Sequence, residues 1–101
     1  MEHIMSTLLD RCQNVISKIL PRNYYMDDCG YSEDRFRVAI YRDYGMRNGV
    51  PKTEFVTDFI FIYDKQDYIE EGITLDEQYT IWMKDVVYWL EQRFEIYLDK
   101  L

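Results

Sequence analysis

The sequence predicts a two-layer α+β fold, in which an N-terminal helix and a long C-terminal helix pack on an antiparallel hairpin. Three observations predict it: helical spacing of apolar residues near the N-terminus, two stretches of β-forming residues in the middle, and an uninterrupted helical pattern near the C-terminus. The chain has 101 residues and contains neither an internal repeat nor a linker-like stretch, so we expect a single domain over residues 1–101.

The first helix is expected between Ile4 and Leu20. Its apolar residues recur three or four positions apart, which places them on one side of an amphipathic helix. They are Ile4, Leu8, Cys12, Val15, Ile16 and Ile19. Because the residue before a proline is pushed out of helical geometry, we expect Pro21 to end this helix.

Two strands are expected over residues 35–44 and 53–63. The first alternates apolar residues such as Phe36 and Val38 with polar ones, which is typical of a half-buried strand. The second carries apolar side chains on both faces. The connection contains Asn48-Gly49, a common pair in hairpin turns, so we expect an antiparallel hairpin.

A hairpin alone is rarely stable in water, so this sheet needs a third strand, covering helices or a partner. Residues 24–31 offer a short third strand, but Asp27, Asp28 and Gly30 within them are poor strand formers. The sequence leaves this strand open.

The last helix has the clearest start signal. Thr74 and Glu77 are spaced as a capping box, in which each side chain satisfies a free backbone amide of the first turn. Nothing in the sequence breaks the helix from there to Leu101. Its apolar residues form two adjoining stripes that span roughly 200° of the helical wheel, against about 100° for an ordinary amphipathic helix. We therefore expect it either to contact both the sheet and the first helix or to leave apolar surface for another chain.

Charge is distributed unevenly along the chain. The sequence holds 19 acidic and 12 basic residues, for a formal net charge of −7. Residues 27–34 contribute −4 and residues 58–77 contribute −6, whereas residues 35–52 between them contribute +4. Two acidic segments therefore flank a basic hairpin. Clustered carboxylates can steer association with a basic partner, and the acidic balance argues against direct binding of nucleic acid.

The composition also bears on location. No apolar stretch approaches the roughly 18–20 residues that a membrane span requires. The first residues lack the basic-then-apolar order of a signal peptide, and two cysteines are too few for a disulfide scaffold. We therefore expect a cytoplasmic protein without membrane contact.

The sequence gives little support to catalysis. Tyr25-Met26-Asp27-Asp28 matches the YMDD metal-binding motif of reverse transcriptases, but those enzymes need a palm domain, a further aspartate and a much longer chain. The single histidine lies near the N-terminus, and Cys12 lies on the apolar side of the first predicted helix. We expect a protein that is not an enzyme and has no cofactor, no metal and no catalytic residue.

Aromatic residues favour protein binding instead. They make up 17% of the chain, ten of them tyrosines, and tyrosine is enriched at binding hot spots. The leading hypothesis is a small acidic protein-binding module of the inhibitor or immunity type, similar in kind to the anti-defence proteins of phages and mobile elements. It would dock on a basic, nucleic-acid-binding site of a partner by nucleic-acid mimicry, with carboxylates in the places of phosphates. The expected partner-binding residues are Asp27, Asp28, Tyr31, Asp64, Asp67, Tyr68, Glu70 and Glu71.

Two alternatives remain open. One is a structural subunit, of the phage tail or neck type, that self-associates through the C-terminal helix and a sheet edge; a homodimer belongs to this hypothesis. The other is an enzyme or metal protein built on Asp27, Asp28 and the acidic residues between 64 and 71.

Overall fold

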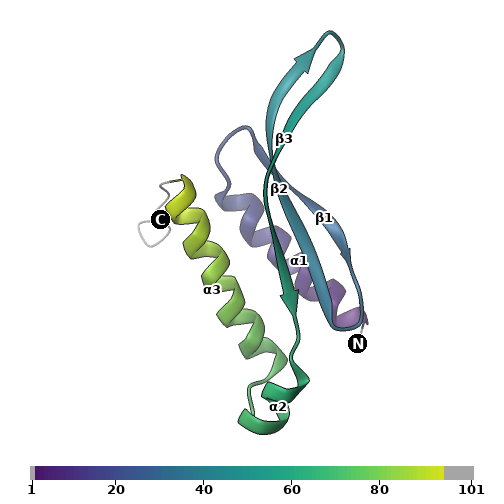
Figure 1. Cartoon of the computed structure of the whole chain (residues 1–101), viewed down its shortest axis with the longest axis vertical. Coiled ribbons are helices and arrows are strands. Elements are labelled where there is room, and N and C mark those ends of the chain that lie inside the picture. Colours follow the sequence, from purple (N-terminus) through teal and green to yellow (C-terminus); the bar gives the residue numbers. More distant parts are fainter. Residues whose placement is uncertain (1, 95–101) are drawn as a thin grey trace.

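The computed structural model describes residues 2–94, with their side chains from Ile4 onward, and confirms the α+β class (Figure 1). One helix comes first along the chain, followed by three strands and then by two further helices. Their bounds are α1 (Glu2–Ile19), β1 (Tyr24–Tyr31), β2 (Arg35–Arg47), β3 (Val50–Ile62), α2 (Lys65–Glu71) and α3 (Leu75–Phe94).

The sheet is antiparallel in the order β1-β2-β3, so β2 is the central strand. β1 is the third strand that the sequence left open. Its pairing with β2 supplies the backbone partners, and its acidic residues Asp27 and Asp28 are exposed at the edge of the sheet. Poor strand formers are therefore tolerated there, because an edge strand buries little of their side chains.

Helices α1 and α3 cover the same face of the sheet, which we call the covered face. The predicted alternation in β2 is confirmed: Phe36, Val38 and Ile40 are fully buried on the covered face, while Arg35 and Arg37 are exposed. The core is completed from α1 by Met5, Leu8, Leu9, Cys12 and Ile16, from β3 by Phe61, and from α3 by Tyr79, Met83, Val86 and Leu90.

The wide apolar surface predicted for the last helix is present in α3. Trp82 and Trp89 are half-buried against the sheet, and the indole Nε1 of Trp82 donates to the carbonyl oxygen of Ile60 at 2.9 Å. Ile81 and Tyr88 lie on the far side and are exposed. The capping box is formed, since the N–H of Glu77 donates to Thr74 Oγ1 at 3.2 Å. The predicted continuation to Leu101 falls partly outside the described residues.

The hairpin is longer than predicted. β2 and β3 run on past the helices into a two-stranded arm, residues 42–55, whose side chains are all exposed (Figure 1). Its turn consists of Asn48 and Gly49 alone, with φ of 54° and 76°. That conformation matches the type I′ turn that Asn-Gly favours, and it joins the strands in two residues instead of the longer loop that was expected.

Helix α2 was not predicted, because the sequence between the hairpin and the last helix was interpreted only as an acidic segment. Asp64 caps its start by accepting from the N–H groups of Gln66 and Asp67, at 2.9 and 3.3 Å. Gly72 ends it in the left-handed region, with φ of 69°. Asp64 and Gly72 are thus ordinary capping residues around a helix too short to show a clear apolar period.

Candidate protein-binding surface

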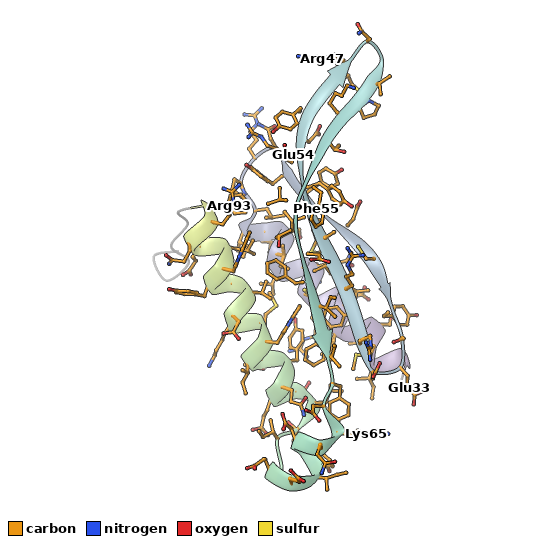
Figure 2. The ribbon with its side chains drawn as sticks, in the orientation of Figure 1. Glu33, Arg47, Glu54, Phe55, Lys65 and Arg93 are labelled. Atoms are coloured by element: carbon orange, nitrogen blue, oxygen red, sulfur yellow. The ribbon has the colours of Figure 1, made fainter. Side chains whose placement is uncertain are left out.

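The two acidic segments meet at one end of the molecule. The N–H of Tyr63 donates to the carbonyl oxygen of Asp34 at 2.8 Å, which joins the turn between β1 and β2 to the start of α2. Glu33 and Lys65 lie at this end, whereas Arg47 lies at the tip of the arm at the opposite end (Figure 2). We define the acidic end as residues 32–34 and 63–77, which together hold eight acidic residues and the single cation Lys65.

Helix α2 is the most exposed element of the acidic end. None of its seven residues is buried. Tyr68 is 52% exposed and Ile69 is 70% exposed, although both are large and apolar enough to contribute to a core. Exposed apolar side chains between carboxylates are typical of a binding surface, in which the apolar groups supply contact area and the charges supply orientation.

The carboxylates of the acidic end fall into two groups. Several are used locally: Asp64 caps α2, Glu70 accepts from the side chain of Gln66 at 2.6 Å, and Glu77 belongs to the capping box. Asp67 and Glu71 instead make no side-chain hydrogen bond or ion pair within residues 2–94. These two project from α2 beside Tyr68 and are available to an external cation.

A polar hollow of about 440 Å³ lies where the turn meets α2. It is lined by Glu33, Asp34, Tyr63 and Lys65. Sequence reasoning did not assign these residues to a site, because the turn and the helix are 30 positions apart and only the sheet register brings them together. Asp34 is already paired with Arg35, whereas Glu33 makes no side-chain hydrogen bond or ion pair within residues 2–94 and is the carboxylate of the hollow that is available to a lysine or arginine of a partner.

The eight residues expected to bind a partner do not form one patch. Five of them, Asp64, Asp67, Tyr68, Glu70 and Glu71, belong to α2 or its cap. Asp27, Asp28 and Tyr31 lie on β1, at the other edge of the sheet, with the whole of β2 between them and β3. The acidic end therefore retains the α2 residues and gains those of the hollow.

The strand arginines are neutralised. Arg37 Nε donates to Asp58 Oδ2 at 2.7 Å, and Arg35 Nε donates to Asp34 Oδ1 at 3.0 Å. The hydrogen bond from Arg35 lowers the pKa of the Asp34 carboxyl and raises the pKa of the guanidinium. Two cations of the basic hairpin are therefore already engaged with carboxylates.

The YMDD tetrapeptide lies within β1. Neighbouring side chains on a strand point to opposite faces, so Asp27 and Asp28 do not converge on one ion. Within residues 2–94 no group of three or more His, Cys, Asp or Glu side chains is placed to hold a metal. Burial raises the pKa of the Cys12 thiol to about 12, which keeps it protonated inside the core.

No family model matches the chain, and neither a curated protein nor a solved structure matches it. Among the described helices, none is long and apolar enough to cross a membrane.

Proposed function

We propose that this chain is a small, non-enzymatic protein-binding module that docks through its acidic end on a basic, nucleic-acid-binding surface of a partner protein. Its role would be that of an inhibitor or immunity-type protein, of the kind that phages and mobile elements direct against host defence. Carboxylates of the acidic end would take the positions of phosphates in the partner's groove. Such a partner would be met in the cytoplasm, where we place the protein.

The observation that carries the proposal is the combination found on α2. A fully exposed helix presents Tyr68 and Ile69 next to Asp67 and Glu71, whose carboxylates have no partner in the described part of the chain. Because α2 contributes no buried residue to the core, its side chains are available for contact with a partner. The apolar pair supplies area to be buried, and the carboxylates select a basic partner over a neutral one.

The charge distribution supports the same orientation. The acidic end sums to −7, whereas the arm at the opposite end sums to +1 from Arg42, Arg47 and Lys52 against Asp43 and Glu54. An electropositive groove therefore attracts one end of the molecule and weakly repels the other, which raises the association rate and aligns the encounter.

The proposal is tested by capture from a lysate of the cells that carry the gene, with two bait variants of equal net charge. Asp67→Lys/Glu71→Lys reverses two charges on α2, and Asp10→Lys/Asp85→Lys reverses two exposed charges on α1 and α3. We expect the wild type and the control Asp10→Lys/Asp85→Lys to retain the same nucleic-acid-binding protein. The α2 variant Asp67→Lys/Glu71→Lys should lose it. Excess duplex DNA or RNA should release the captured protein from the bait, because the nucleic acid and the acidic end compete for the same groove of that protein.

Two outcomes would overturn the proposal. Equal loss in both variants would mean that net charge, not the acidic end, governs retention. Retention that neither nucleic acid nor added salt reduces would mean that the partner is not held through a basic groove.

A second candidate function, that of an assembly subunit, is favoured by the arm. Fourteen residues of β-ribbon project from the body, and no element among residues 2–94 covers them; an isolated ribbon is marginally stable in water. Static light scattering over a concentration series tests this candidate: a closed oligomer of fixed mass supports it, and a monomer throughout contradicts it.

A further inference from the structure

The sheet face opposite the helices, which we call the uncovered face, carries exposed apolar side chains in a band that the ion pair between Arg37 and Asp58 interrupts. Ile60, Ile62 and Phe55 on β3 point to it and are each about half exposed. Phe55 continues a row of rings across all three strands, with Tyr41 at 5.9 Å and Tyr25 a further 5.5 Å away between ring centroids. No helix within residues 2–94 covers this band.

Apolar side chains recur further along the arm, on the side that continues from Phe55. Side chains alternate along β3, so Pro51 lies on the same side as Phe55, and its register partner on β2 is Met46, which is 67% exposed. The cations occupy the other side: Arg42 is the register partner of Glu54, and Lys52 alternates with Pro51. Met46 and Pro51 therefore lie on the side of the arm that continues from Phe55, with the pair Asp43 and Thr53 between them, while Tyr44 and Val50 lie on the other side with the cations.

A shallow hollow of about 360 Å³ interrupts the uncovered face near the acidic end. Ile60 and Ile62 form its apolar wall, and Tyr31, Arg35 and Arg37 surround it. It lies on the body of the sheet, whereas Met46 and Pro51 lie on the arm, about 30 Å away for the nine residues from Pro51 to Ile60 at roughly 3.3 Å each. One molecule thus carries an apolar projection and a hollow that it cannot bring together.

We infer that the uncovered face is the interface between two copies of this chain, stacked face to face and antiparallel. Tyr41 is the seventh of the 13 residues of β2, so a two-fold axis at Tyr41 brings the arm half of β2 over the body half in the other copy. Met46 and its register partner Pro51 lie four ladder positions beyond the Tyr41–Phe55 pair, because β2 has one extra residue between Asp43 and Met46. Met46 then lies opposite Arg37, which is the register partner of Ile60 in the hollow. Each copy fills the other's hollow, which is the self-complementarity that a two-fold interface requires.

Charge selects the antiparallel arrangement over the parallel one. The parallel stack would place the two acidic ends together, each with a net charge of −7, and the two basic arms together. The antiparallel stack places each arm, with a net charge of +1, next to the acidic end of the other copy. Like charges in contact oppose association, so the second copy fits in one direction only.

This inference goes beyond the proposed function and does not depend on it. The interface uses the sheet face opposite the helices, while Tyr68, Asp67 and Glu71 remain on α2. A dimer would therefore present two acidic ends at opposite poles of one assembly. Loss of the dimer and loss of partner binding are separate results, because they follow from different side chains.

The oligomeric state gives the first test. Sedimentation velocity over a concentration series should show a dimer for the wild type, and monomers for Met46→Asp and for Ile60→Asp. The matched control is Ile81→Asp, which places the same charge at an equally exposed apolar position on α3 and should leave the dimer intact. A monomeric wild type would overturn the inference, as would a dimer that Ile81→Asp disrupts and Met46→Asp does not.

Disulfide trapping gives the second test and fixes the direction. In a Cys29→Ser background, Met46→Cys/Ile60→Cys should form an oxidised, covalently linked dimer. The two positions are about 30 Å apart within one chain, too far for a bond that needs Cα atoms within roughly 7 Å. Met46→Cys alone should stay uncrosslinked. A covalent dimer of that single variant would show arm against arm, the parallel arrangement, and would overturn the proposal.

Discussion

The two halves of β2 share one strand and both pair with β3, yet their environments differ completely. The body half also pairs with β1, whereas the arm half beyond Arg42 pairs with β3 alone. From residue 36 to residue 40 the side chains directed at the helices are fully buried, whereas every residue from Arg42 to Arg47 is exposed. The difference lies in α1 and α3, which cover the body of the sheet and stop short of the arm (Figure 1). Pairing alone thus builds the ribbon, but burial decides which part of it stabilises the fold.

The residues that stabilise the fold and the residues available for binding lie in different parts of the molecule. The core residues of the body are held by the covered face, and their substitution acts on the free energy of unfolding. The arm, the uncovered face and α2 contribute little to the core, so their exposed apolar and charged groups are available for contacts with other molecules.

The largest expected effect contrasts two phenylalanines of the hairpin. Phe36→Ala removes a fully buried ring and should lower the free energy of unfolding by about 3–5 kcal/mol. Phe55→Ala removes a half-exposed ring from the uncovered face and should cost the monomer less than about 1 kcal/mol. Urea unfolding at low protein concentration measures both. If Phe36→Ala is too unstable to study, Phe36→Leu should still cost more than Phe55→Ala, and equal costs would contradict the comparison.

An intermediate effect on the free energy of unfolding is expected from alkaline pH. It arises from Cys12, which is buried in the core of the body. Burial holds the pKa of Cys12 at about 12 in the folded protein, against 9.0 ordinarily. Above pH 9 the unfolded chain loses this proton while the folded chain keeps it, so stability falls as pH rises, by up to about 1.4 kcal/mol per pH unit.

Urea unfolding between pH 8 and about 11 measures this slope. Cys12→Ala should flatten it, whereas Cys29→Ser, at an exposed position, should leave it unchanged. Burial also raises the pKa of Tyr79 to about 12, so a residual decline above pH 10 should survive in Cys12→Ala. An unchanged slope in Cys12→Ala would assign the alkaline loss to other groups.

The smallest effect on global stability is expected in the arm. Gly49 has φ of 76°, which costs a residue with a Cβ roughly 1 kcal/mol. Gly49→Ala should therefore accelerate hydrogen exchange of the arm amides, while the exchange of the body amides and the urea midpoint stay within error. A global loss as large as that of Phe36→Leu would show that the arm and the body unfold as one unit.

The sequence predicted the body better than the surfaces. The alternation of Phe36, Val38 and Ile40 and the capping box at Thr74 follow from local physics, and both are confirmed. The length of the arm was missed, because strands exposed on both sides carry no apolar alternation to mark their ends. Helix α2 was missed for a related reason: its signals are the capping residues Asp64 and Gly72, while its apolar residues face solvent.

The sequence indicated which acidic segments the candidate site contains, but not how the fold arranges them. Acidic runs at 27–34 and 58–77 are evident in the sequence, and Asp67, Tyr68 and Glu71 do share one exposed helix. The hydrogen bond from Tyr63 to Asp34, which joins the two runs, is a consequence of the β2–β3 register. The pairing of β1 with the other side of β2 places Asp27 and Asp28 at the opposite edge of the sheet, which no count of charges could indicate.

The most direct test of the central claim, that the acidic end is the docking surface, is the ratio of two dissociation constants for the partner recovered by capture. Titration calorimetry would compare Asp67→Lys/Glu71→Lys with Asp10→Lys/Asp85→Lys, which have identical net charge. We predict that the α2 variant binds at least about tenfold more weakly, a difference of about 1.4 kcal/mol, while the helix control stays within about twofold of the wild type. Equal dissociation constants for the two variants would contradict the claim.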